Sequence, residues 1–406
     1  MKTEKFVNRW AALVVGVIVL LFAGIIYAWS ILKAPFLNDF HWDQGTLGLN
    51  FTIMMACFVI GGIFGGMLQK RIQPRTALWI AAALAFVGFF VSSRLTENGI
   101  GLLIVAYGIL GGLGIGIVYN VVISVVSKRF PDRSTTASGV LMMGFGISTL
   151  AIGSVAGILM EQTDWRNIFL LLAVCMAVVF VIGSFFMTGG PEEAAAAEAA
   201  KAAGGNMPAK QAPPDVETKE MLKRPTFWKL YIFQILVCGI AVCVISIAKD
   251  VSVSVGNAET FAIFMVGLLS VCNGIGRIVG GFLFDRIGRR PTILLASVLA
   301  IIASLVCLFS ILGEIAWLNT IGLVLVGFMY GLNPPISAGN AKSLFGAKFF
   351  PVNFPVINSM LIFASFASTI GGTLYASTGN FTAVFIMLVC FSLAGFGLFL
   401  SVRKQI

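Results

Sequence analysis

The sequence predicts an all-α membrane protein with twelve transmembrane helices. Of its 406 residues, 58% are hydrophobic and only 11% are charged, whereas roughly a quarter of a soluble domain is charged. Apolar runs recur along the whole chain, and each is long enough to cross a hydrocarbon core of about 30 Å. A polar stretch near the middle of the chain divides these runs six and six.

Each apolar run is assigned to one transmembrane helix. The helices are expected at residues 10–34, 46–69, 76–94, 100–126, 136–160, 165–187, 226–248, 260–284, 292–313, 316–340, 353–377 and 380–402. The first run follows Lys2, Lys5 and Arg9, as the apolar part of a secretion signal would. It is long for such a region and many spans follow, so we interpret it as a retained helix.

Residues 189–225 interrupt the apolar runs. The stretch EEAAAAEAAKAAGGNMPAKQAPP is rich in Ala, Gly and Pro and is too poor in large apolar side chains to bury a core. We therefore expect an N-terminal six-helix bundle at 1–188, a flexible cytoplasmic linker at 189–225 and a C-terminal six-helix bundle at 226–406.

The net charge of +10 invites a nucleic-acid interpretation, but its distribution along the chain argues against one. If the N-terminus is inside, nearly all of the 27 Lys and Arg residues fall in loops on the inner side. That bias sets the orientation of membrane helices and needs no acidic partner. We expect a multi-pass protein of the cell (inner) membrane, with both termini cytoplasmic, contacts to the lipid bilayer, no nucleic-acid partner and a monomeric state.

Enzyme chemistry finds little support. All seven cysteines lie in apolar runs without metal-ligand spacing, and the chain has a single His. We find no nucleotide-binding loop and no Ser/His/Asp arrangement. The expectation is a protein that is not an enzyme and that uses no cofactor and no metal.

A short motif occurs twice, once in each half. The second copy reads GFLFDRIGRR from Gly281 to Arg290, and the first reads GMLQKRIQPR from Gly66 to Arg75, with Lys70 in place of the acid. In the second copy Gly281 allows two helices to approach closely. Asp285 can cap a neighbouring helix, while Arg286 and Arg289 can meet carboxylates or helix C-termini. These residues predict a cytoplasmic gate; the alternative is a basic cluster that only sets orientation.

The pattern Gly-x-x-x-Asp-Arg-x-Gly-Arg-Arg, in a chain with twelve spans, resembles the major facilitator superfamily. That resemblance covers the whole length of the chain. It implies two six-helix bundles, each built from inverted three-helix repeats, that rock around a central site near mid-depth of the membrane.

Arg277 is the strongest candidate for a substrate-binding residue. It is the only charged side chain between Thr260 and Phe284, and it precedes Asp285 by eight residues, about 12 Å of helix. A cation at such depth is costly and usually faces a cavity. Asn273 lies one turn away on the same face. A guanidinium matches a carboxylate with two parallel hydrogen bonds, so we expect Arg277 to bind a carboxylate. The alternative is that it pairs inside the protein or reaches the interface.

Three tyrosines are expected near the same depth: Tyr27, Tyr119 and Tyr330. Their hydroxyls can donate to a carboxylate while their rings form the cavity wall; the alternative is that they only fill the core. Pro334 and Pro335 are expected to break the tenth helix just beyond Tyr330.

Within the superfamily, the chain resembles the oxalate:formate antiporter and monocarboxylate transporter branch. The resemblance rests on YAWSILKAPF, KRFPDRSTTASG and EMLKRPTFWKL. It implies that Arg277 is the substrate arginine, that Tyr27, Tyr119 and Tyr330 contact substrate, and that Phe145 lies where some relatives have tyrosine. Two departures matter. Ala364 occupies the place of a second cation in the oxalate carrier, and Asn273 occupies that of an aspartate in proton-coupled animal relatives.

We therefore predict a secondary active transporter of small monocarboxylate anions of the lactate, pyruvate or formate kind. A single arginine balances one carboxylate, whereas a dicarboxylate would leave a desolvated charge. Proton-coupled symport is the expected mode, since a cotransported proton cancels the charge of the anion. Two alternatives stay open: a carboxylate exchanger of the oxalate:formate type, and a carrier of a non-carboxylate solute.

Overall fold

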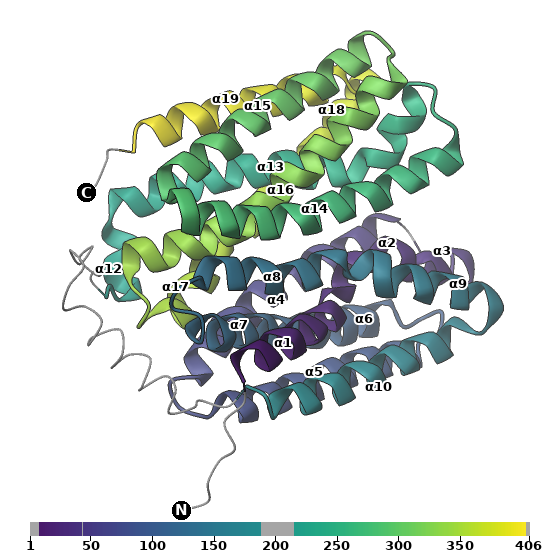
Figure 1. Cartoon of the computed structure of the whole chain (residues 1–406). Helices are drawn as coiled ribbons and strands as arrows, with labels where there is room; N and C mark the ends of the chain where they lie inside the picture. Colours follow the sequence, from purple (N-terminus) through teal and green to yellow (C-terminus); the bar gives the residue numbers. More distant parts are fainter. Residues whose placement is uncertain (1–7, 43, 188–214, 403–406) are drawn as a thin grey trace, which may run out of the picture.

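The computed structural model describes residues 8–42, 44–187 and 215–402, and within these ranges the chain is helical without strands (Figure 1). In these described residues, twelve helical segments are long and apolar enough to cross a membrane. The predicted all-α fold with twelve transmembrane helices is thus confirmed. Most helices of the second half lie in the upper part of Figure 1 and those of the first half in the lower part, while α17 of the second half lies beside α4.

The first half contains six spans, several of which change helix type along their length. Its elements are α1 (Arg9–Ala23), η1 (Gly24–Ala28), α2 (Trp29–Leu32), α3 (Ala34–Asn38), α4 (Gln44–Leu68), α5 (Pro74–Ser92), α6 (Ile100–Leu103), η2 (Ile104–Gly111), α7 (Gly112–Lys128), α8 (Ser134–Ser148), η3 (Thr149–Gly153), α9 (Ser154–Gln162) and α10 (Trp165–Ser184). Side chains start two of the helices, because Asn8 accepts from the Trp10 amide and Asp164 accepts from the Arg166 amide.

The second half begins with a short helix and continues with six spans. Its elements are α12 (Thr218–Lys223), α13 (Pro225–Ser254), α14 (Glu259–Ile287), α15 (Arg289–Leu312), α16 (Ala316–Phe345), α17 (Phe350–Asn358), α18 (Met360–Thr378) and α19 (Thr382–Leu400). Gly288 separates α14 from α15 with φ of 86°, a conformation that glycine adopts without strain.

Part of the predicted linker is not a loose connector. Residues 188–214 lie outside the described residues, but 215–223 pack against the second half. The Val216 amide donates to the Phe345 carbonyl at 2.9 Å, and Asn353 Nδ2 donates to the Val216 carbonyl at 2.9 Å. Val216 and Met221 are buried. The burial of these two apolar side chains holds residues 215–223 against the second half. The sequence analysis did not predict this packing, because the segment follows a low-complexity stretch.

The tenth span was expected to break at Pro334 and Pro335, and this expectation is wrong. Helix α16 runs without interruption from Ala316 to Phe345 with both prolines inside it. Proline removes a helical hydrogen bond but does not force a break where packing holds the backbone. Here the α16 backbone at Gly331 packs directly on Asn273 and Gly276 of α14.

Other spans carry the irregular segments instead. The first span tightens into a 3₁₀ helix at Gly24–Ala28, and the fourth and fifth spans widen into π-helical stretches, η2 and η3. The eleventh span is divided at Ser359 between α17 and α18. Such local changes of helix type are tolerated inside a protein because neighbouring helices shield the backbone from lipid.

The two halves meet mainly along α8 with α14 and along α4 with α17. We call the end of the helices that carries Lys70, Lys128, Arg286 and Lys348 the basic end. At this end the two contacts are alike. A side chain on Gly281 would clash with the Thr135 carbonyl of α8, and a side chain on Gly66 would clash with the Pro351 carbonyl of α17. Both glycines of the repeated motif therefore permit close backbone contact between the halves.

Candidate functional site

Arg277 lies between the two halves and is 1% exposed. Its Nε donates to Asn273 Oδ1 at 3.1 Å, one turn earlier on α14, as the spacing predicted. Its Nη1 donates to the Met142 carbonyl of α8 at 2.7 Å. No ion pair of Arg277 with a carboxylate is present among the described residues. The guanidinium has five N–H donors, so these two bonds leave donors for a ligand.

Small residues make the space that Arg277 occupies. Gly139 and Gly146 of α8 face it, and a Cβ on Gly146 would lie 3.0 Å from Arg277 Nε and 3.1 Å from its Cζ. On the other side of α14, Gly276 and Gly331 bring α16 into backbone contact. The guanidinium is therefore held between three closely packed helices, with little freedom to reach lipid.

A central cavity lies beside the guanidinium. Its walls are Tyr27, Phe58, Tyr119, Phe145, Cys238, Arg277, Tyr330, Pro334, Asn358, Met360 and Leu361. Five of the residues singled out from sequence thus line one space: Arg277, the three tyrosines and Phe145. The sixth, Asn273, does not line the cavity but accepts a hydrogen bond from Arg277 Nε. The cavity measures about 20 Å³, slightly more than the ~10–15 Å³ that one water needs. A carboxylic acid can enter only after the walls move apart.

Aromatic rings form the wall contributed by the first half. The Phe145 ring centroid lies 5.3 Å from that of Tyr27 and 4.9 Å from that of Tyr119, in edge-to-face contacts. Phe58 lies 5.2 Å from Tyr119 and completes the cluster. Tyr27 and Tyr330, one from each half, line the same cavity. The aromatic rings of this wall favour a ligand with a small apolar body.

The electrostatics of the cavity are simple. Arg277 is the only charged residue among those that line it. Ala364, where the resemblance places a second cation, is buried near the Gly239 backbone of α13 and does not line the cavity. The site thus presents one unpaired positive charge in a region of low dielectric constant, which one carboxylate would neutralise.

Several lining residues were missed from sequence. Phe58, Cys238 and Asn358 reach the cavity from α4, α13 and the end of α17. Asn358 is the one with a polar side chain suited to hydrogen bonding. Its position just before the interruption at Ser359 could have drawn notice, because Pro355 precedes Asn358 by three residues.

The proposed gate residues lie at the basic end. Asp285 Oδ2 accepts from the Thr136 amide at 2.7 Å and from the Thr136 hydroxyl at 2.8 Å, in the first turn of α8. Lys342, which sequence reasoning did not single out, donates to Ser138 Oγ at 3.2 Å in the same turn. Two residues of the second half thus hold one helix start of the first half.

Arg286 and Arg289 were expected to meet carboxylates or helix C-termini. No ion pair of either with a described carboxylate is present, and Arg286 lies over the Phe282 ring at 5.5 Å from its centroid. The nearby acid, Asp285, is already engaged by α8. Their part in a gate stays a prediction.

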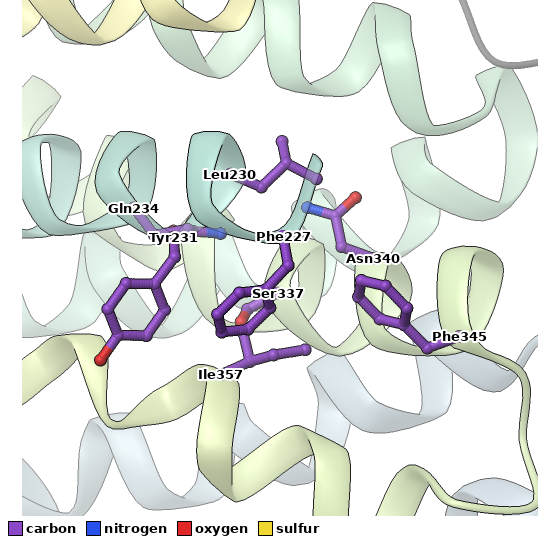
Figure 2. A pocket seen from close by; sticks show the side chains of 8 residues that line it. All are labelled: Phe227, Leu230, Tyr231, Gln234, Ser337, Asn340, Phe345 and Ile357. Carbon is purple, nitrogen blue, oxygen red and sulfur yellow. The ribbon is translucent and has the colours of Figure 1, made fainter. Parts of the chain in front are cut away.

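A second small cavity lies wholly inside the second half, among α13, α16 and α17 (Figure 2). It measures about 20 Å³ and is lined by Phe227, Leu230, Tyr231, Gln234, Ser337, Asn340, Phe345 and Ile357. Gln234 Nε2, Ser337 Oγ and Asn340 Oδ1 have no hydrogen-bond partner there. Its size and polarity suit one water, and no charged group lines it, so it is not a site for an anion.

The family model described as Major Facilitator Superfamily matches residues 12–349. The oxalate:formate antiporter of Oxalobacter formigenes is 22% identical over 96% of this chain and 91% of its own length. Monocarboxylate transporter 12-B of Danio rerio is 26% identical over 82% of this chain and 73% of its own.

Among solved structures, the proton:xylose symporter XylE has a TM-score of 0.72 at 14% identity, covering 97% of this chain and 95% of its own. At that identity the likeness concerns the fold alone.

Proposed function

The chain belongs to the Major Facilitator Superfamily and is a multi-pass membrane transporter rather than an enzyme, and from this premise we propose that it carries small monocarboxylate anions by alternating access. The observation that supports this most strongly is Arg277. It is buried between the halves, has no carboxylate partner among the described residues and is the only charged residue lining the central cavity.

The cargo we propose is a monocarboxylate of the lactate, pyruvate or formate kind. Arg277 would hold the carboxylate, with Asn273 fixing the guanidinium from behind. Tyr27, Tyr119 and Tyr330 would donate hydroxyls, and Phe145 with Phe58 would contact the apolar body. A dicarboxylate would bring a second negative charge with no second cation in the lining to balance it.

The gate we propose combines Asp285, Arg286 and Arg289 with Lys342. In the described structure Asp285 and Lys342 contact the N-terminal turns of α8, and we propose that these contacts close the basic end. Release of these contacts would let the halves separate there, while the central cavity opens toward the same side.

Proton coupling is the mode we favour. Moving an anion inward against a membrane potential costs about 2.3 kcal/mol per 100 mV, and a cotransported proton removes that cost. No carboxylate lines the central cavity. The proton would therefore travel with the substrate–arginine pair.

Exchange of one carboxylate for another is the second candidate, favoured by the similarity to the oxalate:formate antiporter. Labelled lactate uptake into proteoliposomes distinguishes the modes. Symport predicts uptake that rises with an imposed inward proton gradient. Exchange predicts stimulation by internal carboxylate and indifference to the gradient. If neither lactate nor any other carboxylate is taken up, with a proton gradient or with internal carboxylate, the proposal is wrong. The cargo is then a non-carboxylate solute.

We also propose the orientation. The basic end carries most of the Lys and Arg side chains outside the membrane, so it would face the cytoplasm of the cell (inner) membrane, together with both termini. We propose a monomer with bundles at 1–188 and 226–406.

A further inference from the structure

A larger cavity lies at the basic end, apart from the central site. It measures about 280 Å³, many times the ~10–15 Å³ of one water and near the ~300 Å³ at which small-molecule pockets begin. Gly66, Lys70 and Lys128 line it from the first half, and Lys348 and Pro351 line it from the second. It therefore lies across the contact between α4 and α17, where the halves meet.

Three lysines face this cavity: Lys70 just after α4, Lys128 at the end of α7 and Lys348 in the loop before α17. Lys70 and Lys348 lie over the same ring, with their Nζ atoms 5.7 Å and 5.3 Å from the Phe349 centroid. None of the three forms an ion pair with a described carboxylate. Asp215 Oδ1 accepts from the Lys348 backbone amide at 3.1 Å. The three ammonium groups thus lie at one cavity without an ion-paired carboxylate among the described residues.

The two copies of the repeated motif differ in charge at the position of the acid. In the second half, the motif acid Asp285 accepts two hydrogen bonds in the first turn of α8. In the first half, the corresponding residue is Lys70, which is cationic. The helix it faces, α17, begins at Phe350, and the residue before it, Phe349, provides no side-chain cap. Gly66 nevertheless packs on Pro351 as Gly281 packs on Thr135. The contact between α4 and α17 therefore has the same close backbone approach as that between α14 and α8, but it has no motif carboxylate.

We propose that the pocket of Lys70, Lys128 and Lys348 binds an anion of the phosphate class, and that the bound anion supplies the negative charge which the first motif copy lacks. The anion would be either a free inorganic phosphate or the headgroup of an anionic phospholipid. Ammonium groups are strongly hydrated point charges that suit phosphate oxygens.

The anion would act on the conformational equilibrium. Lys70 and Lys128 belong to one half and Lys348 to the other, so the full site exists only while the basic end is closed. A ligand that binds one state better shifts the population toward that state. Bound phosphate therefore stabilises the closed basic end and slows its opening. This inference concerns control of the gate and does not depend on which solute is carried.

The first test is thermal unfolding of the full chain in detergent, with sodium phosphate against sodium chloride at equal ionic strength. Phosphate is expected to raise Tm in a saturable manner. Lys70→Gln is expected to weaken phosphate about tenfold, since a charge-assisted contact is lost. Arg71→Gln, an adjacent exposed cation outside the pocket, removes the same charge and is expected to leave the affinity unchanged.

Lys70→Asp places a carboxylate at the position that corresponds to Asp285, and it is the most discriminating test of the proposal. It is expected to raise Tm without phosphate and to abolish the response to phosphate. A phosphate response that survives in Lys70→Asp, or that falls equally in Lys70→Gln and Arg71→Gln, overturns the proposal, because the effect would then follow from net charge alone.

Nanodiscs in a buffer without inorganic phosphate separate the two sources. If the anion is a lipid headgroup, phosphatidylglycerol raises Tm above phosphatidylcholine in the wild type but not in Lys70→Asp. If it is a free anion, only added phosphate does so. Absence of both responses overturns the proposal.

The conformational effect has its own readout. Spin labels at Thr76→Cys and Ser343→Cys, both exposed and in opposite halves, report the separation of the basic end in a background without native cysteines. Phosphate is expected to shift the distance distribution toward the short component. An unchanged distribution at saturating phosphate contradicts the gating part of the inference.

Discussion

At the scale of single residues, the function rests on how Arg277 is held. The Met142 carbonyl and Asn273 satisfy two of its donors and fix its direction, while no carboxylate of the described chain neutralises it. A buried charge without a counter-charge is costly. It is kept where an incoming anion completes the pair, which is the reason to place the substrate here.

Arg277→Lys keeps the charge but loses the planar fork. We expect the Kd for a monocarboxylate to rise roughly 10- to 100-fold, because a hydrogen bond to a charged group is worth about 1.5–3 kcal/mol. Arg277→Gln should abolish binding. Isothermal titration of the purified protein measures both. Arg94→Gln, an exposed arginine far from the cavity in sequence and depth, is the control. Retention of wild-type affinity in Arg277→Gln would show that the site is elsewhere.

Gly146→Ala tests the position of the guanidinium without touching it. The added methyl lies about 3.0 Å from Arg277 Nε and must displace it. We expect transport to fall by at least about tenfold, because a small misplacement of a binding group is costly. Gly397→Ala on α19, where a Cβ meets nothing within 4 Å, is the matched control and should transport normally. Uptake per folded protein is the measurement, and equal uptake in both variants would contradict the geometry.

At the scale of elements, the two contacts between the halves at the basic end, α4 with α17 and α14 with α8, are built alike. We call these two contacts the seams. A motif glycine lets the end of α4 or α14 approach the start of α17 or α8. The seams differ in charge, since α8 is capped by Asp285 and α17 faces Lys70. The closure of the basic end is therefore asymmetric, with a built-in carboxylate on only one side.

The pair Asp285 and Thr136 should be energetically coupled. Asp285→Asn removes the charge that stabilises the α8 start, and Thr136→Val removes the hydroxyl donor while leaving the amide. A double-mutant cycle on unfolding should give a coupling of about 0.5–3 kcal/mol. Thr96→Val with Asp285→Asn is the control pair and should be additive. Additivity in the test pair as well would mean that the observed contact contributes nothing to closure.

At the scale of the whole molecule, the basic side chains and the two copies of the motif lie at the same end of the helices. Lys and Arg gather at one end of the helices, and both gate seams lie at that end. The cations that we propose to orient the protein therefore also surround the surfaces that would separate in the proposed gate.

The orientation can be tested by labelling single cysteines from outside intact cells. Lys219→Cys lies at the basic end and Asn98→Cys at the opposite end, and both positions are exposed. In a background without native cysteines, a membrane-impermeant maleimide should label only Asn98→Cys. Lys219→Cys should react only after the membrane is opened. The reverse pattern would invert the assignment of the basic end.

The sequence by itself determined the number of spans, the all-α class, the family and the identity of the buried cation. These follow from local properties: apolar runs, loop charges and one motif with fixed spacing. It also singled out Tyr27, Tyr119, Phe145 and Tyr330, which share the cavity with Arg277.

Only the tertiary structure decided what depends on distant segments coming together. It placed Asn358 in the cavity, kept α16 whole through two prolines and brought Lys70, Lys128 and Lys348 to one pocket. Whether a proline breaks a helix, or three lysines meet, depends on packing between helices. No local pattern in the chain records that packing.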